Sequence, residues 1–315
     1  MTQEAPARSW MGYGALFLGV SLFSTIEIAS KVVGQRAPVD TFVMVFVRFF
    51  VTSVVLLLIS AGSWRGRIRG FGLGDWGIFC LNGFVGITVS ISLFHMAIMS
   101  FRNAASSAVV FSANPVFVTI LARYINGEPW SRGKWLSVVL GATGIAAFAW
   151  ESGNPTSESL LGLSLMIGAA VSFALSICIS RRHVGRYGPV AFMGFSSFFG
   201  SVFVLPLGLW RGGSAGFAAM AEGWLLVGYI VVFGTAVAYG AYYFGLSRTS
   251  AYEASMSFFM KPVLASALSV VLLRESLNVW TVSGTALIVG GLFLSIRLPG
   301  RKTGVGRVGQ GERIQ

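Results

Sequence analysis

Two stretches of this chain resemble each other: Pro115–Glu128, PVFVTILARYINGE, and Pro262–Glu275, PVLASALSVVLLRE. The second copy begins 147 residues after the first, close to half of the chain length. Each copy runs from proline to glutamate and lies in an apolar segment long enough to cross a bilayer. The sequence therefore predicts a membrane protein built from two related halves.

The composition excludes an ordinary soluble domain. The chain is 55% hydrophobic and only 11% charged, whereas about 25% of the residues in a typical soluble domain are charged. A helix needs about 20 apolar residues to cross the hydrocarbon core. Ten such segments are predicted, which gives an all-helical integral membrane protein. They span approximately residues 10–32, 40–62, 75–98, 103–125, 133–150, 159–180, 189–210, 224–246, 251–273 and 278–297.

Tryptophan placement supports these boundaries independently. Indole rings prefer the interface between membrane and water, and every tryptophan of the chain lies within a few residues of a predicted span end. The nine are Trp10, Trp64, Trp76, Trp130, Trp135, Trp150, Trp210, Trp224 and Trp280.

The net charge of +12 reflects membrane orientation. Cytoplasmic loops of membrane proteins carry an excess of Lys and Arg. With the N-terminus inside, sixteen basic residues fall on the inner side and five on the outer side, which leaves Arg48 and Lys261 within the membrane. The sequence therefore predicts cytoplasmic termini, with residues 1–9 as an uncleaved N-terminal segment and residues 298–315 as a disordered basic tail. Nucleic-acid binding is not needed to explain the charge.

The similarity between the halves extends beyond the opening stretches. Residues 86–97 align with residues 234–245 at an offset of 148, and Pro38 aligns with Pro189 at 151. Each half, 10–150 and 159–297, is then expected to contain five spans. Because five is odd, the second half must enter the membrane from the opposite face. Inverted repeats of this kind suit alternating access, in which a central site opens first to one side and then to the other.

Several short motifs occur in a recognisable order. They are Lys31, Arg48, Ala97-Ile98 before Asn103-Ala104-Ala105, Asn114-Pro115 through Glu128, Gly234-Thr235-Ala236, Leu246 through Ala251, Lys261-Pro262 and Arg274-Glu275. In order and spacing they resemble the EamA-type ten-helix members of the drug/metabolite transporter superfamily over nearly the whole chain. The resemblance implies secondary transport across a bacterial inner membrane, often export of metabolites or amino acids, without an ATP-binding domain. Neither a cofactor nor a metal site is expected.

Lys261 is the clearest candidate for a substrate-binding residue. A charge near the bilayer centre is costly, so an ionisable residue there is a functional hypothesis by default. Pro262 follows it directly and is expected to kink the helix, leaving a carbonyl one turn back without its partner. Lys261 could then anchor a carboxylate or carry a proton. The alternatives are a structural ion pair and a side chain that reaches to the interface.

Asn114-Pro115 occupies the equivalent place in the first half, with an amide where the second half has a lysine. The substrate is therefore expected between Asn114 and Lys261. A proline kink at Pro115 that serves packing alone is the competing interpretation.

Two further charged residues lie within predicted spans. Arg48 could bind a carboxylate through its planar guanidinium, serve as a scaffold residue as the resemblance favours, or pair with an acidic group elsewhere. Glu27 precedes Lys31 by four residues, the spacing of a helical ion pair, and a buried carboxylate there could instead couple transport to protons.

Tyr239, Tyr242 and Tyr243 lie at the spacing of one helix face. Their rings could hold an aromatic group or an ammonium through cation–π attraction, although such stripes more often serve packing. His95 is expected at the membrane interface. Glu128 and Glu275 are expected to tether loops or form gates at opposite faces.

These observations favour a secondary transporter with one central site, bordered by the first, second, third, fourth, eighth and ninth spans. The expected substrate is a small amphipathic metabolite, best an amino acid or related carboxylate, with protons as a candidate coupling ion and lipid as the surroundings. The alternatives are an exporter of cationic drugs or toxic compounds, and a channel or receptor. An enzyme is not expected, because Asp40 and Asp75 are the only aspartates and offer no paired metal-binding carboxylates. The sequence does not distinguish a monomer from a homodimer.

Overall fold

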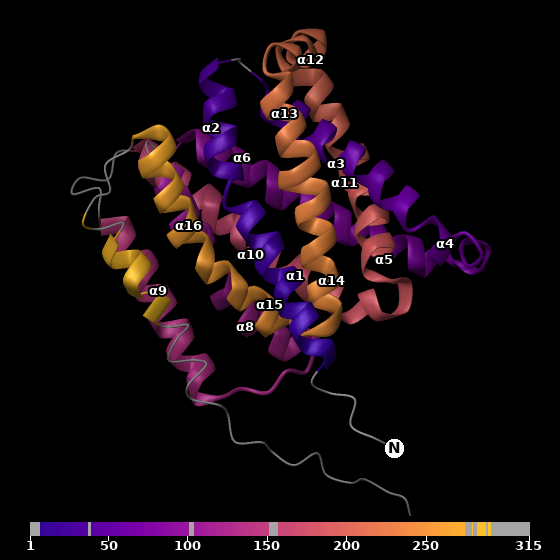
Figure 1. The fold of residues 1–315 in the computed structure, drawn as a ribbon, viewed down its shortest axis with the longest axis horizontal. Coiled ribbons are helices and arrows are strands. Elements are labelled where there is room, and N and C mark those ends of the chain that lie inside the picture. Colours follow the sequence, from indigo (N-terminus) through magenta and orange to yellow (C-terminus); the bar gives the residue numbers. More distant parts are fainter. Residues whose placement is uncertain are drawn as a thin grey trace, which may run out of the picture.

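The computed structural model describes residues 7–36, 39–100, 104–150 and 157–274, together with residues 279, 282–287 and 289–290. Helices fill this part of the chain, and no strand occurs in it. The helices pack side by side as a bundle, with α9 at its edge and α12 at one end (Figure 1).

The helices fall into two series. The first comprises α1 (Ala7–Phe23), α2 (Ile26–Arg36), α3 (Thr41–Ile59), α4 (Ala61–Trp64), η1 (Ile68–Gly70), α5 (Leu73–Gly83), η2 (Phe84–Val89), α6 (Ser90–Ser100), α7 (Ala104–Phe111), α8 (Asn114–Ile125) and α9 (Arg132–Trp150). The second comprises α10 (Ser157–Tyr187), α11 (Pro189–Arg211), α12 (Gly213–Glu222), α13 (Trp224–Val231), η3 (Val232–Val237), α14 (Ala238–Arg248), α15 (Ala251–Met256), η4 (Ser257–Phe259), α16 (Met260–Leu268) and η5 (Ser269–Leu273).

Local sequence signals set several helix ends. Asp40 caps α3 by accepting hydrogen bonds from the backbone N–H groups of Phe42 and Val43, at 2.9 and 3.2 Å. Ser250 and Glu253 form a capping box at the start of α15. Gly188 joins α10 to α11 with φ of +84°, a conformation that favours glycine.

Seven of the ten predicted spans coincide with helical segments long and apolar enough to cross a membrane. These are Trp10–Gly34, Thr41–Ile59, Leu73–Ser100, Leu160–Tyr187, Pro189–Arg211, Trp224–Arg248 and Ala251–Leu273. The predicted span 103–125 forms two shorter helices, α7 and α8, and the predicted span 133–150 forms α9. Most of the predicted span 278–297 lies outside the described residues, as do the terminal segments 1–6 and 291–315. The count of ten stays a prediction.

The outer surface of the bundle is apolar, as lipid contact requires. Phe17, Leu58, Phe233 and Val271 are exposed by 57%, 64%, 50% and 74%. A water-soluble protein rarely exposes large contiguous apolar patches. The structure therefore fits a multi-pass membrane protein.

Two helices contain a matching irregularity. The segments η2 and η3 are π-helical turns, and η3 begins 148 residues after η2. This is the offset at which residues 86–97 align with residues 234–245. A π-helical turn carries one extra residue and is frequently found at functional sites. Both halves of the chain thus carry the same local distortion at the same position.

The two spans that contain the repeated proline stretches are also interrupted at matching places. A turn at Ser112 and Ala113 separates α7 from α8, and Pro115 sits in the first turn of α8, where its missing N–H costs little. The 3₁₀ turn η4 separates α15 from α16 just before Lys261 and Pro262. Because α7 packs on α16 while α8 packs on α15, the two spans run antiparallel and their interruptions lie close together.

The remaining pairings are reciprocal between the halves. Helix α1 lies along α14 (Figure 1), and α6 lies along α10. In each pair the first span of one half contacts the third span of the other. Helices α3 and α11, the second span of each half, pack on one another.

Helices α5 and α11 approach so closely that only glycine fits between them. A Cβ atom added at Gly83 would lie 2.3 Å from the Ser196 carbonyl oxygen and 2.7 Å from the Gly200 backbone nitrogen. Backbone atoms cannot move aside as a flexible side chain can, so this contact fixes how deeply the two helices pack.

We expect Gly83→Ala to lower the midpoint of thermal unfolding in detergent, because the added methyl group forces α5 and α11 apart at a cost of about 1–3 kcal/mol. Gly77→Ala in the same helix is the matched control, since nothing lies within 4 Å of its added Cβ. Equal midpoints for the two variants would contradict this packing.

Candidate functional site

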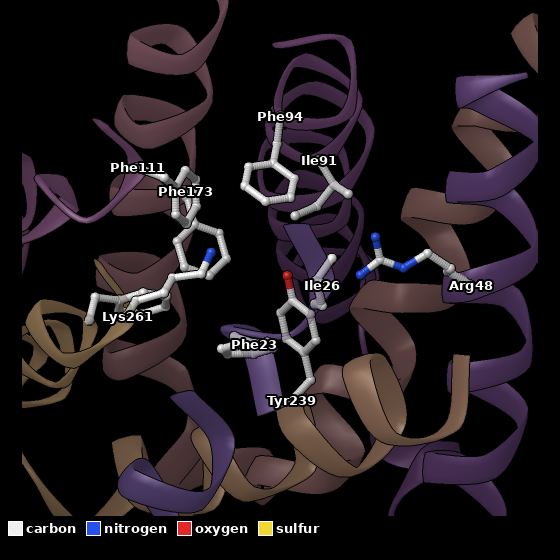
Figure 2. Close-up of a pocket in the computed structure, with 10 residues that line it drawn as sticks. Phe23, Ile26, Arg48, Ile91, Phe94, Phe111, Phe173, Tyr239 and Lys261 are labelled. Carbon is white, nitrogen blue, oxygen red and sulfur yellow. The ribbon is translucent and has the colours of Figure 1, made fainter. Parts of the chain in front are cut away.

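A small cavity lies inside the bundle and contains two basic side chains (Figure 2). All six of the spans expected around a central site contribute to it, and α10 contributes in addition. The space accessible to water is about 20 Å³, enough for about one molecule. The cavity is lined by Phe23, Ile26, Arg48, Ile91, Phe94, Phe111, Phe173, Tyr239, Phe258 and Lys261.

Lys261 forms an ion pair with Glu27, a residue 234 positions away in the sequence. The two side chains are 2% and 0% exposed. The Lys261 ammonium also lies over the rings of Phe94 and Phe111, 4.9 and 4.6 Å from their centroids. Glu27 is not among the cavity-lining residues, so it neutralises Lys261 from behind the cavity wall.

Arg48 is held by two neutral groups. Its Nε donates a hydrogen bond to Thr235 Oγ1 at 3.0 Å, and its Nη1 donates one to His95 Nε2. A guanidinium can only donate. His95 Nε2 must therefore be the acceptor, and the ring is neutral with its proton on Nδ1. Thr235 belongs to the π-helical turn η3, and its hydroxyl donates to the Ile230 carbonyl at 2.6 Å.

The cavity consequently has one positive charge in excess. Among the described residues, no carboxylate lies within 4.0 Å of the Arg48 guanidinium, which is only 1% exposed. The acidic partner considered for Arg48 from the sequence is thus not present in this part of the chain. Two cations and one carboxylate are buried together, although an uncompensated buried charge is costly.

The three tyrosines of α14 have different surroundings. Tyr239 lines the cavity, and its hydroxyl lies between Arg48 and Lys261 (Figure 2). Tyr242 packs its ring on Phe258, with centroids 5.4 Å apart, and its hydroxyl has no hydrogen-bond partner among the described residues. Tyr243 bonds instead with Ser180, with 3.0 Å between the hydroxyl oxygens. Only the first tyrosine reaches the cavity.

Asn114 is buried but is not part of the cavity wall. Its amide nitrogen donates a hydrogen bond to the Ala170 carbonyl of α10 at 2.8 Å. The structure therefore does not bring Asn114 and Lys261 together around one space. Phe111, one turn earlier in the same span, lines the cavity instead.

The expectation for His95 is wrong. It was predicted at the membrane interface, but it is 3% exposed and binds Arg48. Its position near a predicted span end suggested the interface, whereas the rotation of α6 turns it inward. Thr235 belongs to the Gly234-Thr235-Ala236 motif, and nothing in the sequence indicates its hydrogen bond with Arg48.

Glu128 links the two halves at one end of the bundle. Its carboxylate accepts a hydrogen bond from the Ala251 N–H at 2.8 Å and lies 3.5 Å from the Lys134 ammonium. The end of α8 is thereby tied to the start of α15. Glu275, its counterpart in the second half, lies outside the described residues.

Membrane-length apolar helices packed around a small, mostly apolar cavity that contains Arg48 and Lys261 define a multi-pass integral membrane protein. The sequence pattern of the EamA-like transporter family matches residues 10–150 and again residues 160–297. The chain belongs to this family, and it is a membrane transporter.

Individual proteins agree with this assignment. An uncharacterized transporter of Clostridium kluyveri is 27% identical, covering 90% of this chain and 92% of its own length. The uncharacterized transporter YetK of Bacillus subtilis is 25% identical, over 90% of this chain and 86% of its own. A solved crystal structure with 19% identity matches at a TM-score of 0.67, over 93% of this chain and 97% of that one, which shows a shared fold.

We expect Lys261→Met to lower the free energy of unfolding by up to about 3–5 kcal/mol, because it leaves the Glu27 charge buried without its partner. The double variant Glu27→Gln/Lys261→Met should recover most of the stability, since no charge is then stranded. The measurement is the thermal unfolding midpoint in detergent, and a double variant no more stable than the single one would contradict the pair.

Proposed function

We propose that this membrane transporter is a secondary carrier that works by alternating access. It would move a small amphipathic metabolite with a carboxylate, such as an amino acid or related compound, through the central cavity. The buried excess of positive charge in an otherwise apolar cavity is the observation that carries the proposal.

Two halves of opposite orientation would supply the machinery. The proposal is supported by the two family matches, by the paired π-helical turns and by the antiparallel packing of the two interrupted spans. The reciprocal contacts of α1 with α14 and of α6 with α10 are those that an inverted repeat requires. In one state the α1–α14 contact would be tight and the α6–α10 contact loose, and in the other state the reverse. The cavity would then open first to one side and next to the other.

The cavity is too small for such a substrate as it stands. A space of about 20 Å³ accepts about one water molecule, so the surrounding helices must separate before a metabolite enters. The interruptions at Ser112–Ala113 and η4 break two helices directly beside the site, where the helical hydrogen-bond pattern is already irregular. A closed cavity between two accessible states is what a carrier needs, whereas a channel needs a continuous path.

The lining also favours a particular kind of substrate. Arg48 and Lys261 would attract an anionic group, and the rings around them would take an apolar body. We also propose export across a bacterial inner membrane, with both termini in the cytoplasm. The family resemblance supports export, and the distribution of basic residues supports this orientation. Glu27 and Lys261 are the candidates for proton coupling. A cationic substrate would be repelled by the excess positive charge of the cavity, so the lining does not favour the alternative of a cationic-drug exporter.

We expect saturable, counterflow-stimulated flux in proteoliposomes. Vesicles loaded with a millimolar excess of unlabelled leucine or 4-methylpentanoate should take up the same labelled compound faster than empty vesicles do, for at least one of the two. The reason is that the binding site of a carrier reorients across the membrane faster when it is occupied than when it is empty. Flux that is linear in concentration, without stimulation from the opposite side, would contradict the carrier and favour a channel.

We expect Lys261→Met to abolish this counterflow while the protein still inserts into the membrane and purifies as a single species. The substitution cancels the positive excess of the cavity and leaves Glu27 unpaired. Arg65→Met, which removes an exposed cation outside the spans, is the control and should transport normally. Full activity of Lys261→Met would remove that residue from the transport cycle.

A further inference from the structure

We infer that the substrate of this transporter carries one net negative charge, and that its carboxylate binds Arg48 rather than Lys261. The inference rests on the proposed function and narrows its substrate class to apolar monocarboxylates that lack an ammonium group. It assigns carboxylate binding, which the sequence suggests for both cations, to Arg48 alone.

The charge balance of the buried site supports the first part. Among the described residues, the charged and titratable groups that line the cavity or contact its cations are Arg48, Lys261, Glu27, His95 and Tyr239. His95 accepts from Arg48 and is neutral, and the Tyr239 hydroxyl carries no charge near neutral pH. The sum is one positive charge. A zwitterion leaves that excess in place and a cation doubles it, but a monoanion removes it, which a low-dielectric site favours strongly.

The partners of the two cations support the second part. Lys261 already has a carboxylate partner in Glu27, so a substrate carboxylate bound there would either displace Glu27 or share one ammonium with it, which places two buried anions side by side. Arg48 has only neutral partners, and its two hydrogen bonds use two of the five N–H groups that a guanidinium offers. The remaining donors can hold a carboxylate without breaking an existing ion pair.

The geometry places Arg48 to do this. Its guanidinium reaches into the cavity from one side while Lys261 approaches from the other, with the Tyr239 hydroxyl between them (Figure 2). That hydroxyl can donate a further hydrogen bond to a carboxylate at Arg48. The rest of the wall is apolar, and the rings of Phe94, Phe111 and Phe173 would contact the body of the substrate.

The test compares compounds of nearly equal size and different charge. The first set is 4-methylpentanoate, leucine and 3-methylbutylamine, and the second is 3-phenylpropanoate, phenylalanine and 2-phenylethylamine. Binding to the purified full-length protein is measured by thermal shift and calorimetry. At least one of the two anions should bind at least about tenfold more tightly than its zwitterion, and the amines should not compete.

Four variants then separate the effect of the net charge of the site from the question of which cation binds the substrate carboxylate. Lys261→Met should lose at least about tenfold in affinity for the anion, because the site becomes neutral. Glu27→Gln/Lys261→Met restores the single positive charge on Arg48 and should regain the affinity. Arg48→Gln should lose it, and Arg48→Gln/Glu27→Gln should stay weak although its net charge equals that of the wild type.

Two binding results would overturn the inference. The first is that neither anion binds more tightly than its zwitterion, including the case in which neither anion binds. The second is that Arg48→Gln/Glu27→Gln regains affinity while Glu27→Gln/Lys261→Met does not. Lys261 would then be the residue that binds the substrate carboxylate. Counterflow is a separate readout. Exchange of leucine but not of 4-methylpentanoate would support the proposed carrier function and contradict this inference.

Discussion

The burial of two cations with one carboxylate is the constraint on which the rest of this structure depends. Charges at the centre of a bilayer persist only when protein groups replace their water. Glu27 supplies that replacement for Lys261 and joins α2 to α16. His95 and Thr235 supply it for Arg48 and join α3 to α6 and η3. The ion pair and hydrogen bonds that stabilise the buried charges therefore also hold together helices from both halves of the chain.

The irregular helical segments place these groups. Thr235 lies within the π-helical turn η3, His95 follows η2, and Lys261 follows the 3₁₀ turn η4. A regular helix would present a different face at each of these positions, since one extra residue in a turn rotates everything beyond it. Irregular backbone at membrane depth is tolerated where it is buried in protein or lines a cavity. The distortions therefore lie where a transport site needs them.

The composition of the chain and the repeat along its sequence predict much of the fold. They predict less of the candidate site. Apolar length predicts the seven membrane-length helical segments found among the described residues. Arg48 and Lys261 stand out because they lie well inside their predicted spans, whereas the other basic residues lie at span ends or in loops. Partners are harder to predict, because Glu27 meets Lys261 only through the packing of α2 on α16. Helix rotation decides the other outcomes. It turns His95 inward, directs Asn114 toward α10, and brings Tyr239 but not Tyr243 to the cavity.

In this proposal the excess positive charge on Arg48 forms the substrate site, and Glu27 stays paired with Lys261. The most direct measurement is an experimental structure of the wild-type protein with 4-methylpentanoate bound. We expect the carboxylate about 2.7–2.9 Å from the Arg48 guanidinium nitrogens, with Lys261 still paired to Glu27. A carboxylate bound to Lys261, with Glu27 displaced, would contradict it.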